Sequence, residues 1–377
     1  MNQAAIAIIL PPRERFRSAD AGAVALTIKD FVLVSTYLSA KKIVVLGRET
    51  QAFSEVPYQY VPQSFLGRVL GTTKGYAYDC CQWLSKNPSV LIVEVHNRIE
   101  LAVHIKRHFP HLNVCVHLHN DPHSMEGAKT ASQRQRLLAI LDVVYCVSDY
   151  VRVQLLSGVS GAIEGDGEKV QVIHNALSVP QSVIVPQQVK QPCLVYVGRF
   201  IPEKGVLELA QALAVVLPKL PQWQAVFLGA WGFGHAVGKS SYEQEVYAAL
   251  AQVSTQVDFR GHVAQAEVMK TLATSSIVVV PSVCGEAFGR VALEAMSMAN
   301  AVVVSNFGAL PEVAGSAAII LPEVNQAFLI STLTELMANP TKIKEIADHC
   351  QQRAINQFNV LNIVKHLDST RAALLKD

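Results

Sequence analysis

Short apolar runs alternate with longer helical patterns along most of this 377-residue chain. In the first half, six runs have the length and β-branched content of buried strands, and four intervening segments have apolar positions at helical spacing. The strand candidates are AIAIIL (5–10), KIVVLG (42–47), VLIVEVH (90–96), VCVHLH (114–119), VVYCV (143–147) and VQVIHN (170–175), and the helix candidates are 20–38, 64–86, 99–108 and 130–141. This alternation predicts a parallel sheet with helices on both faces.

The alternation stops once and then restarts. Residues 186–192, PQQVKQP, have two prolines, three glutamines and no apolar periodicity, which is typical of a linker. Six further strand candidates follow, at 194–198, 224–229, 257–261, 277–281, 301–305 and 317–321. We therefore expect an α/β protein with two doubly wound, Rossmann-like domains, residues 1–185 and 193–356, facing each other across a ligand cleft. Residues 357–377 form a predicted helix that is expected to pack back on the first domain.

Composition and charge narrow the class of protein. Half of the residues are apolar and only 16% are charged, as in a compact globular protein. Residues 1–136 carry 16 Lys and Arg against 10 Asp and Glu, net +6, whereas the remainder carries 16 against 20, net −4. This excess is too small and too scattered for a nucleic-acid binder, but it favours an anionic surface or acceptor as much as ordinary surface variation.

The cysteines and the apolar runs indicate a cytoplasmic location. The seven cysteines include no CxxC pair and have mostly apolar neighbours, which is typical of reduced, buried thiols. No signal peptide is evident at the N-terminus, and no apolar run approaches the ~20 residues that a membrane span requires.

Two strand-to-helix loops of the second half carry the candidate chemistry. After the strand at 277–281, Glu286 precedes a helix that begins near Gly289, and Glu294 lies on the second turn of that helix. A helix start favours phosphate, and ionised carboxylates accept strong hydrogen bonds from hydroxyl groups. After the strand at 194–198, one tight loop carries Arg199 and Lys204, cations suited to phosphate oxygens. The pattern predicts a nucleotide-sugar site.

These motifs resemble those of the retaining GT-B glycosyltransferases of family 4. The resemblance rests on GRFIPEKG (198–205), on Glu286-AFGRVAL-Glu294, and on AVVVSNFGALPEVAG (301–315), which contains Glu312. The first domain matches more loosely, through HND at His119–Asp121. It departs at 174–178, where most relatives have a proline, then Asn-Gly and an acid.

The resemblance implies roles for residues of the second domain. Arg199 and Lys204 would bind the donor diphosphate, assisted by backbone N–H groups of Phe288 and Gly289. The three other contacts would be Glu294 to the ribose, Glu286 to the hydroxyls of the donor sugar, and the backbone of His262 and Val263 to the base.

In the first domain, the resemblance implies that Gly22 approaches the diphosphate and that His119 contacts the sugar near its reacting carbon. It implies no metal and no cofactor, because the nucleotide sugar is a co-substrate and cations take the place of a metal. No DxD motif occurs in the sequence.

The expected activity is a retaining transfer of a hexose from a UDP- or GDP-sugar to a growing glycan, in lipopolysaccharide core, capsule or exopolysaccharide assembly. The expected partners are the donor and a glycan or lipid-linked glycan acceptor, with an anionic membrane surface as a further partner and peripheral attachment to the inner face of the cytoplasmic membrane. Two alternatives stay open: a soluble acceptor, as in sucrose or glycogen synthesis, or a non-catalytic coat or scaffold protein.

Several residues have competing interpretations. His119 fits an active-site residue or a core histidine. Together with His96, His117 and His123 it is only a weak indication of a zinc site, because HxH on a strand lacks further spaced ligands. Glu94 is expected at the cleft. Segment 64–86 fits a packing helix or a membrane-surface contact. Gly238-Lys239-Ser240 resembles a phosphate loop but lacks its earlier glycine, so it is expected only to border the donor cleft.

Overall fold

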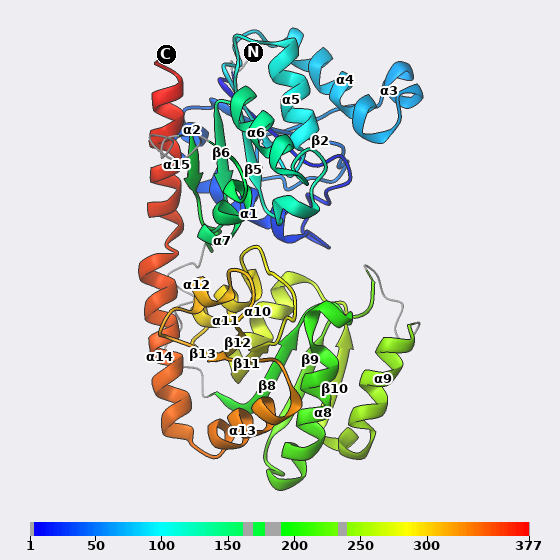
Figure 1. Cartoon of the computed structure of the whole chain (residues 1–377), viewed down its shortest axis with the longest axis vertical. Coiled ribbons are helices and arrows are strands. Elements are labelled where there is room, and N and C mark those ends of the chain that lie inside the picture. The colour runs from blue at the N-terminus through cyan, green and yellow to red at the C-terminus, as the bar shows by residue number, and fades with distance from the viewer. Residues whose placement is uncertain (1–3, 161–168, 178–189, 233–239, 377) are drawn as a thin grey trace. The chain divides into compact units, whose positions relative to one another are not determined.

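The computed structural model describes residues 4–160, 169–177, 190–232 and 240–376 of the chain. The chain divides into two compact units. Unit 1 consists of residues 1–178 together with 359–377, and unit 2 consists of residues 179–358. Each unit contains one parallel sheet with helices packed against it (Figure 1).

Unit 1 has seven parallel strands in the order β3-β2-β1-β4-β5-β6-β7. The strands are β1 (Ile6–Ile9), β2 (Ile43–Gly47), β3 (Tyr58–Tyr60), β4 (Ile92–His96), β5 (Asn113–Leu118), β6 (Val143–Cys146) and β7 (Val170–Val172). The helices are α1 (Ala23–Val34), α2 (Thr36–Ser39), α3 (Phe65–Val69), α4 (Thr72–Ser85), α5 (Ile99–His108), α6 (Ala131–Ile140), α7 (Asp149–Leu156) and α15 (Val360–Leu374). The strand order reverses between β1 and β4, the position at which open α/β sheets generally bind ligands.

Unit 2 has six parallel strands in the order β10-β9-β8-β11-β12-β13. They are β8 (Gln191–Val197), β9 (Gln224–Leu228), β10 (Val257–Gly261), β11 (Ser275–Val280), β12 (Ala301–Ser305) and β13 (Ile319–Leu321). The helices are α8 (Val206–Val216), α9 (Ser241–Leu250), α10 (Gln265–Thr274), α11 (Arg290–Ser297), α12 (Leu310–Ala314), α13 (Gln326–Met337) and α14 (Pro340–Gln357). Here the order reverses between β8 and β11, the strands that precede the two motif loops.

The predicted class, two doubly wound parallel sheets, is confirmed. Two details of the prediction are wrong. The helix predicted at 64–86 is broken after α3, where Gly71 has a φ of +81°. The linker predicted at 186–192 falls partly on residues 186–189, outside the described residues, while Gln191 and Pro192 already belong to β8. Strand β3 and helix α7 were not predicted, because both are short and weakly periodic.

A buried ionic cluster fixes α15 to the sheet of unit 1. The Arg371 side chain, 1% exposed, donates from Nε and Nη2 to the two carboxylate oxygens of Glu94 on β4, at 2.7 and 2.8 Å. Its Nη1 donates to Asp368 at 2.8 Å. Asp368 in turn accepts hydrogen bonds from Ser35 Oγ, at 2.9 Å, and from the backbone N–H of Thr36, at 2.8 Å. The expectation that Glu94 lies at a ligand cleft is wrong, because α15 covers it.

Removing one partner of this cluster leaves a buried charge without compensation. We therefore expect Arg371→Met to destabilise unit 1 by about 3–5 kcal/mol, measured as a lower midpoint of its denaturant-induced unfolding. Lys365→Met, at an exposed position of the same helix, is the matched control and is expected to leave the midpoint unchanged. Equal midpoints for the two variants would contradict a stabilising role of the cluster.

Candidate functional site: a charged loop pair and an apolar pocket in unit 2

The loops that follow β8 and β11 meet at the point where the strand order of unit 2 reverses. Lys204, at the end of a 3-10 turn (Pro202–Lys204), forms an ion pair with Glu286 of the β11–α11 loop. The same Glu286 oxygen accepts a hydrogen bond from Ser282 Oγ at 2.7 Å. The Lys204 and Glu286 side chains are 24% and 19% exposed, so a ligand can reach both. The structure thus joins two of the predicted site residues directly.

Two glycines allow this approach. Gly205 has a φ of +63°, and a Cβ at this position would lie 1.9 Å from the carbonyl oxygen of Pro281. Gly308 also has a φ of +63°, and its Cβ would lie 2.3 Å from the backbone nitrogen and oxygen of Glu286. No other residue fits either position without backbone movement. The backbone of the Glu286 loop is therefore held between the loops after β8 and β12.

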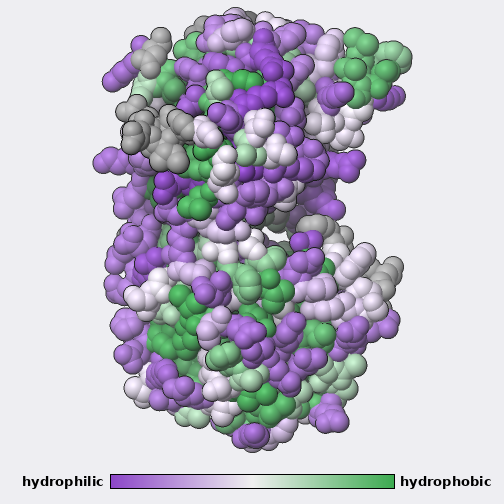
Figure 2. Space-filling model, viewed as in Figure 1, coloured by the Kyte–Doolittle hydropathy of each residue, from purple (hydrophilic) through white to green (hydrophobic). Residues whose placement is uncertain are grey.

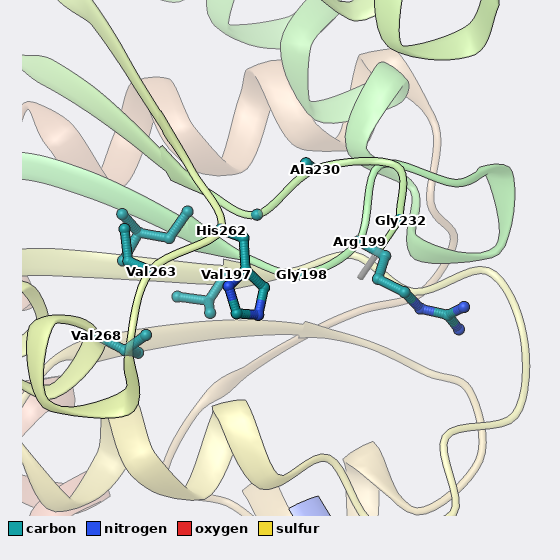
Figure 3. Close-up of a pocket in the computed structure, with 10 residues that line it drawn as sticks. Val197, Gly198, Arg199, Ala230, Gly232, His262, Val263 and Val268 are labelled. Atoms are coloured by element: carbon teal, nitrogen blue, oxygen red, sulfur yellow. The ribbon is translucent and has the colours of Figure 1, made fainter. Parts of the chain in front are cut away.

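An apolar cavity of about 200 Å³ lies at the carboxyl ends of β8, β9 and β10. Its lining is mainly aliphatic or glycine backbone, with two polar side chains, Arg199 and His262: the residues are Val197, Gly198, Arg199, Leu228, Gly229, Ala230, Gly232, His262, Val263 and Val268. Figure 3 shows the Arg199 side chain extending away from Val263 and Val268. The cavity can enclose a flat apolar group while a cation lies at its edge. Of the phosphate-loop-like segment, residues 233–239 lie outside the described part of the chain.

Glu294 lies on α11 and is almost fully buried. One of its oxygens accepts hydrogen bonds from Arg290 Nε, at 2.9 Å, and from Gln265 Nε2, at 2.8 Å. Gln265 begins α10, the helix whose Val268 lines the cavity, so Glu294 is connected to the cavity wall. Sequence reasoning missed Arg290 and Gln265; the spacing of four residues between Arg290 and Glu294 was the available signal.

Gly289 and Phe288 precede α11. Gly289 is the N-cap of this helix, with a φ of +91°. Phe288 as a whole is 3% exposed, and its ring packs edge-to-face against Phe358, at 5.6 Å between ring centroids. The side chain is therefore part of the core, and the contact of the Phe288 backbone with the diphosphate stays a prediction.

The two predicted site residues of unit 1 have different surroundings. His119, directly after β5, has its Nε2 2.8 Å from His96 Nδ1, and its backbone N–H donates to Asn97 Oδ1 at 2.8 Å. Gly22 is the N-cap of α1, and a Cβ there would lie 3.1 Å from a Glu14 oxygen. The same oxygen accepts from the Ala25 N–H at 3.3 Å. An acid of the chain itself thus occupies the helix start at which a diphosphate was expected, and sequence reasoning missed it.

Glu94, His96 and His117 each place a ligand atom within 4.8 Å of the others, close enough for one metal ion to be considered. The His96 and His117 rings are stacked within 10° of parallel at 4.2 Å between centroids. Their nitrogen lone pairs therefore run side by side instead of converging on one point, and both Glu94 oxygens already accept from Arg371. This geometry does not fit a zinc site.

Residues 181–357 match the family model described as Glycosyl transferases group 1. The chain is 25% identical over 227 residues to a lipopolysaccharide 1,2-N-acetylglucosaminetransferase of Salmonella typhimurium, and this alignment covers 59% of this chain and 56% of the relative. It is 27% identical over 248 residues to an alpha-maltose-1-phosphate synthase of Mycolicibacterium smegmatis, covering 59% of this chain and 61% of the relative. The match therefore spans little more than half the length of these relatives.

Among solved structures, the chain resembles Anabaena HepE in complex with UDP and glucose. The TM-score is 0.73 and the identity 18%, with 98% of this chain and 99% of that chain covered. At this identity the likeness shows the fold alone.

The buried histidines His96, at the end of β4, and His119, directly after β5, lead to a prediction about stability at acid pH. Burial, together with the charge of His117, lowers the pKa of His119 to about 3, and burial lowers the pKa of His96 far below its usual value. Histidines of the unfolded chain take up protons near pH 6.5. The contribution of these neutral rings to stability is therefore fully present above about pH 6.5 and is lost as the pH falls toward 3.

Between pH 7 and pH 5, we expect the wild type to lose roughly 1–2 kcal/mol more unfolding free energy than His119→Asn, which lacks one of these groups. Denaturant titrations at pH 7, 6 and 5 measure this difference. His366→Asn, at an exposed position of α15, should retain the wild-type dependence. The same pH dependence in wild type and His119→Asn would show that His119 is not held neutral by the fold.

Proposed function

Because the chain belongs to the group 1 glycosyltransferases, family 4, and has the GT-B fold, we propose that it transfers a hexose from a nucleotide sugar to a growing glycan with retention of configuration. The observation that carries the proposal is the Lys204–Glu286 pair at the edge of unit 2 where the strand order reverses. It combines a cation for phosphate with an acid for sugar hydroxyls, and the cavity that His262 lines lies at the same, carboxyl end of the sheet.

The cavity suits the base of the donor. A planar base can lie among Val197, Leu228 and Val263 and hydrogen-bond to backbone groups near His262. Arg199, at the edge of this cavity, then lies on the path from the base to the diphosphate. Glu294, held by Arg290 and Gln265, is proposed to accept hydrogen bonds from the ribose hydroxyls.

The proposed catalytic effect is stabilisation of the negative charge on the leaving nucleoside diphosphate. When the sugar leaves, negative charge builds on the nucleoside diphosphate, and Arg199 and Lys204 are proposed to stabilise it without a metal. In the free protein Glu286 compensates Lys204, so the pair brings no net charge of its own. Donor binding would exchange this ion pair for contacts from Lys204 to phosphate and from Glu286 to sugar hydroxyls. The contact of His119 with the sugar stays a prediction, and a contact of Gly22 with the diphosphate would require the Glu14 carboxylate to leave the start of α1.

The donor is proposed to carry UDP or GDP, and UDP-glucose is the first probe because HepE binds it. The proposed acceptor is a glycan of lipopolysaccharide core, capsule or exopolysaccharide assembly. The relationship to the Salmonella enzyme supports that pathway.

Lys204→Ala is expected to lower donor turnover more than 100-fold, equivalent to about 2.7 kcal/mol of transition-state stabilisation. UDP release is measured from the UDP-sugar that gives the largest thermal shift in a screen of UDP-, GDP- and ADP-sugars, where binding at 100 times Kd adds about 2.7 kcal/mol. Lys270→Ala, on the exposed face of α10, is the control. Near-normal turnover of Lys204→Ala would contradict the charge role, and a wild type without any shift would favour a scaffold protein.

A lipid-linked acceptor is favoured by the surface of α3. Phe65, Leu66 and Val69 are 78%, 52% and 69% exposed, and Figure 2 shows apolar side chains gathered over this helix. The helix is anchored: its N-cap, Ser64, donates to Asp79, which also forms a 2.6 Å ion pair with Arg48. A fixed helix that turns its apolar side chains to solvent is typical of a contact surface rather than of a packing helix.

Two exposed cations, Arg68 on α3 and Lys74 on α4, lie close in sequence to these apolar residues. Apolar side chains combined with basic ones fit an anionic membrane surface. Within the described residues, no helix is long and apolar enough to cross a bilayer. We therefore propose peripheral attachment through α3 at the inner face of the cytoplasmic membrane.

The double variant Phe65→Ser, Val69→Ser should reduce binding to vesicles of phosphatidylglycerol and phosphatidylethanolamine at least tenfold, because burying each apolar side chain is worth about 1.5–3 kcal/mol. Flotation at low and high salt measures binding. Val153→Ser, which changes an exposed valine on α7, is the control. If the wild type does not bind these vesicles at low salt, the attachment is excluded.

A further inference from the structure

The contact between His96 and His119 uses one ring nitrogen of each residue. His96 ends β4, and His119 follows the neighbouring strand β5. The 2.8 Å separation between His96 Nδ1 and His119 Nε2 requires one proton between them. His119 Nε2 is therefore engaged within the protein, and Nδ1 is the nitrogen that remains for a ligand.

His96 is held firmly from its other side. Its ring stacks on His117, and the His117 ring lies 4.5 Å from that of Tyr145, centroid to centroid. His117 Nε2 is 3.4 Å from a carboxylate oxygen of Glu94, which the guanidinium of Arg371 binds through two hydrogen bonds. Burial alone would raise the pKa of Glu94, but the charge of Arg371 and its hydrogen bonds keep the pKa well below the usual value. Within the described residues His117 Nε2 makes no hydrogen bond, so its ring is held by packing against Tyr145, and the ring of His96 by its stack on His117.

The buried His96 Nε2 decides the direction of the hydrogen bond. This nitrogen has no hydrogen-bond partner in the part of the chain that the structure describes. If His119 donated to His96, the His96 proton would lie on Nε2 as an orphaned, buried N–H. If His96 donates from Nδ1, only a lone pair stays unpaired. Orphaned N–H groups are the rarer and more costly case in folded proteins.

We propose that His96 is a positioning residue which donates from Nδ1 to His119 and so places the proton of His119 on its Nδ1, making that nitrogen a hydrogen-bond donor to a ligand oxygen. This inference rests on the proposed function for the nature of that oxygen, a hydroxyl of the transferred sugar. A donor at this position discriminates against a ligand that lacks the oxygen, which makes His96 a determinant of sugar recognition without contact to the sugar.

The neutral state of both rings agrees with this role. Burial lowers the pKa of both histidines, so neither is protonated twice near neutral pH. In a neutral, hydrogen-bonded pair of histidines the tautomer of one ring determines that of the other, and the surroundings of His96 place its proton on Nδ1.

The first test reads the tautomer directly. In ¹⁵N NMR spectra of the full chain at pH 7.5, His119 should show a protonated Nδ1 and an unprotonated Nε2, with the signals assigned by loss in His119→Asn. His96→Asn keeps an amide donor at the place of Nδ1 and should preserve this pattern. His96→Leu removes the donor and should give a mixture of tautomers. A wild-type His119 protonated on Nε2 would overturn the proposal.

The second test separates sugar recognition from folding. The ratio of the affinities for UDP-glucose and UDP, measured by calorimetry, should fall about three- to tenfold in His96→Leu, the range of one neutral hydrogen bond. The affinity for UDP alone should not change. His96→Asn should restore the ratio, and His366→Asn should not alter it. An unchanged ratio in His96→Leu would count against the positioning role.

The two proposals can fail separately. If the wild type binds neither UDP nor UDP-glucose, and the wider donor screen is also negative, the proposed function fails. The tautomer of His119 still decides the claim about His96, because the spectra require no ligand.

Discussion

The site in unit 2 depends on the close approach of two loops that follow neighbouring strands. A lysine after β8 and a glutamate after β11 can pair only because glycine backbone allows the chain to pass within van der Waals distance at Gly205 and Gly308. Without that approach the cation would be an ordinary surface lysine. The two loops follow the strands at which the strand order reverses, and the glycines let them approach each other closely. The opposite charges of Lys204 and Glu286 cancel in the ion pair until a ligand binds.

The sequence predicts this part of the molecule well because each signal is local. Strand runs, glycine turns and charged loops lie within a few residues of each other, and parallel strands bring their carboxyl ends to the same edge. Arg290 and Gln265 were missed since their meeting at Glu294 depends on how α10 and α11 pack. Glu94 was misplaced for a similar reason. Its partner Arg371 is 277 positions away, and no periodicity connects an acid inside an apolar strand with one arginine on a distant helix.

In unit 1, polar residues at alternate positions of two buried strands lie on the same side of the sheet, a feature that is missed when only the apolar residues of a strand are considered. Alternate positions of β4 and β5 face the same way, and the register pairs His96 with His117, so the strands align Glu94 and the histidines on one side of the sheet. Such groups are costly to bury and are tolerated when each finds a partner. Here Glu94 is paired with Arg371 and His96 Nδ1 with His119, whereas His96 Nε2 and His117 Nε2 make no hydrogen bond within the described residues. The fold thereby uses hydrogen bonding rather than shape alone to define where His119 lies.

The buried ionic cluster around Arg371 has a consequence for the order in which the two units fold during synthesis. Chains emerge from the ribosome with the N-terminal part first, and domains generally fold as they appear. Unit 2, residues 179–358, is complete before α15 has been made. Unit 1 begins earlier, but the Glu94 carboxylate on its sheet has neither its covering helix nor its cation until residue 371 has been translated. The part of the chain that starts first thus reaches its native state last, and nascent chains stalled before α15 are the forms most exposed to chaperones and proteases.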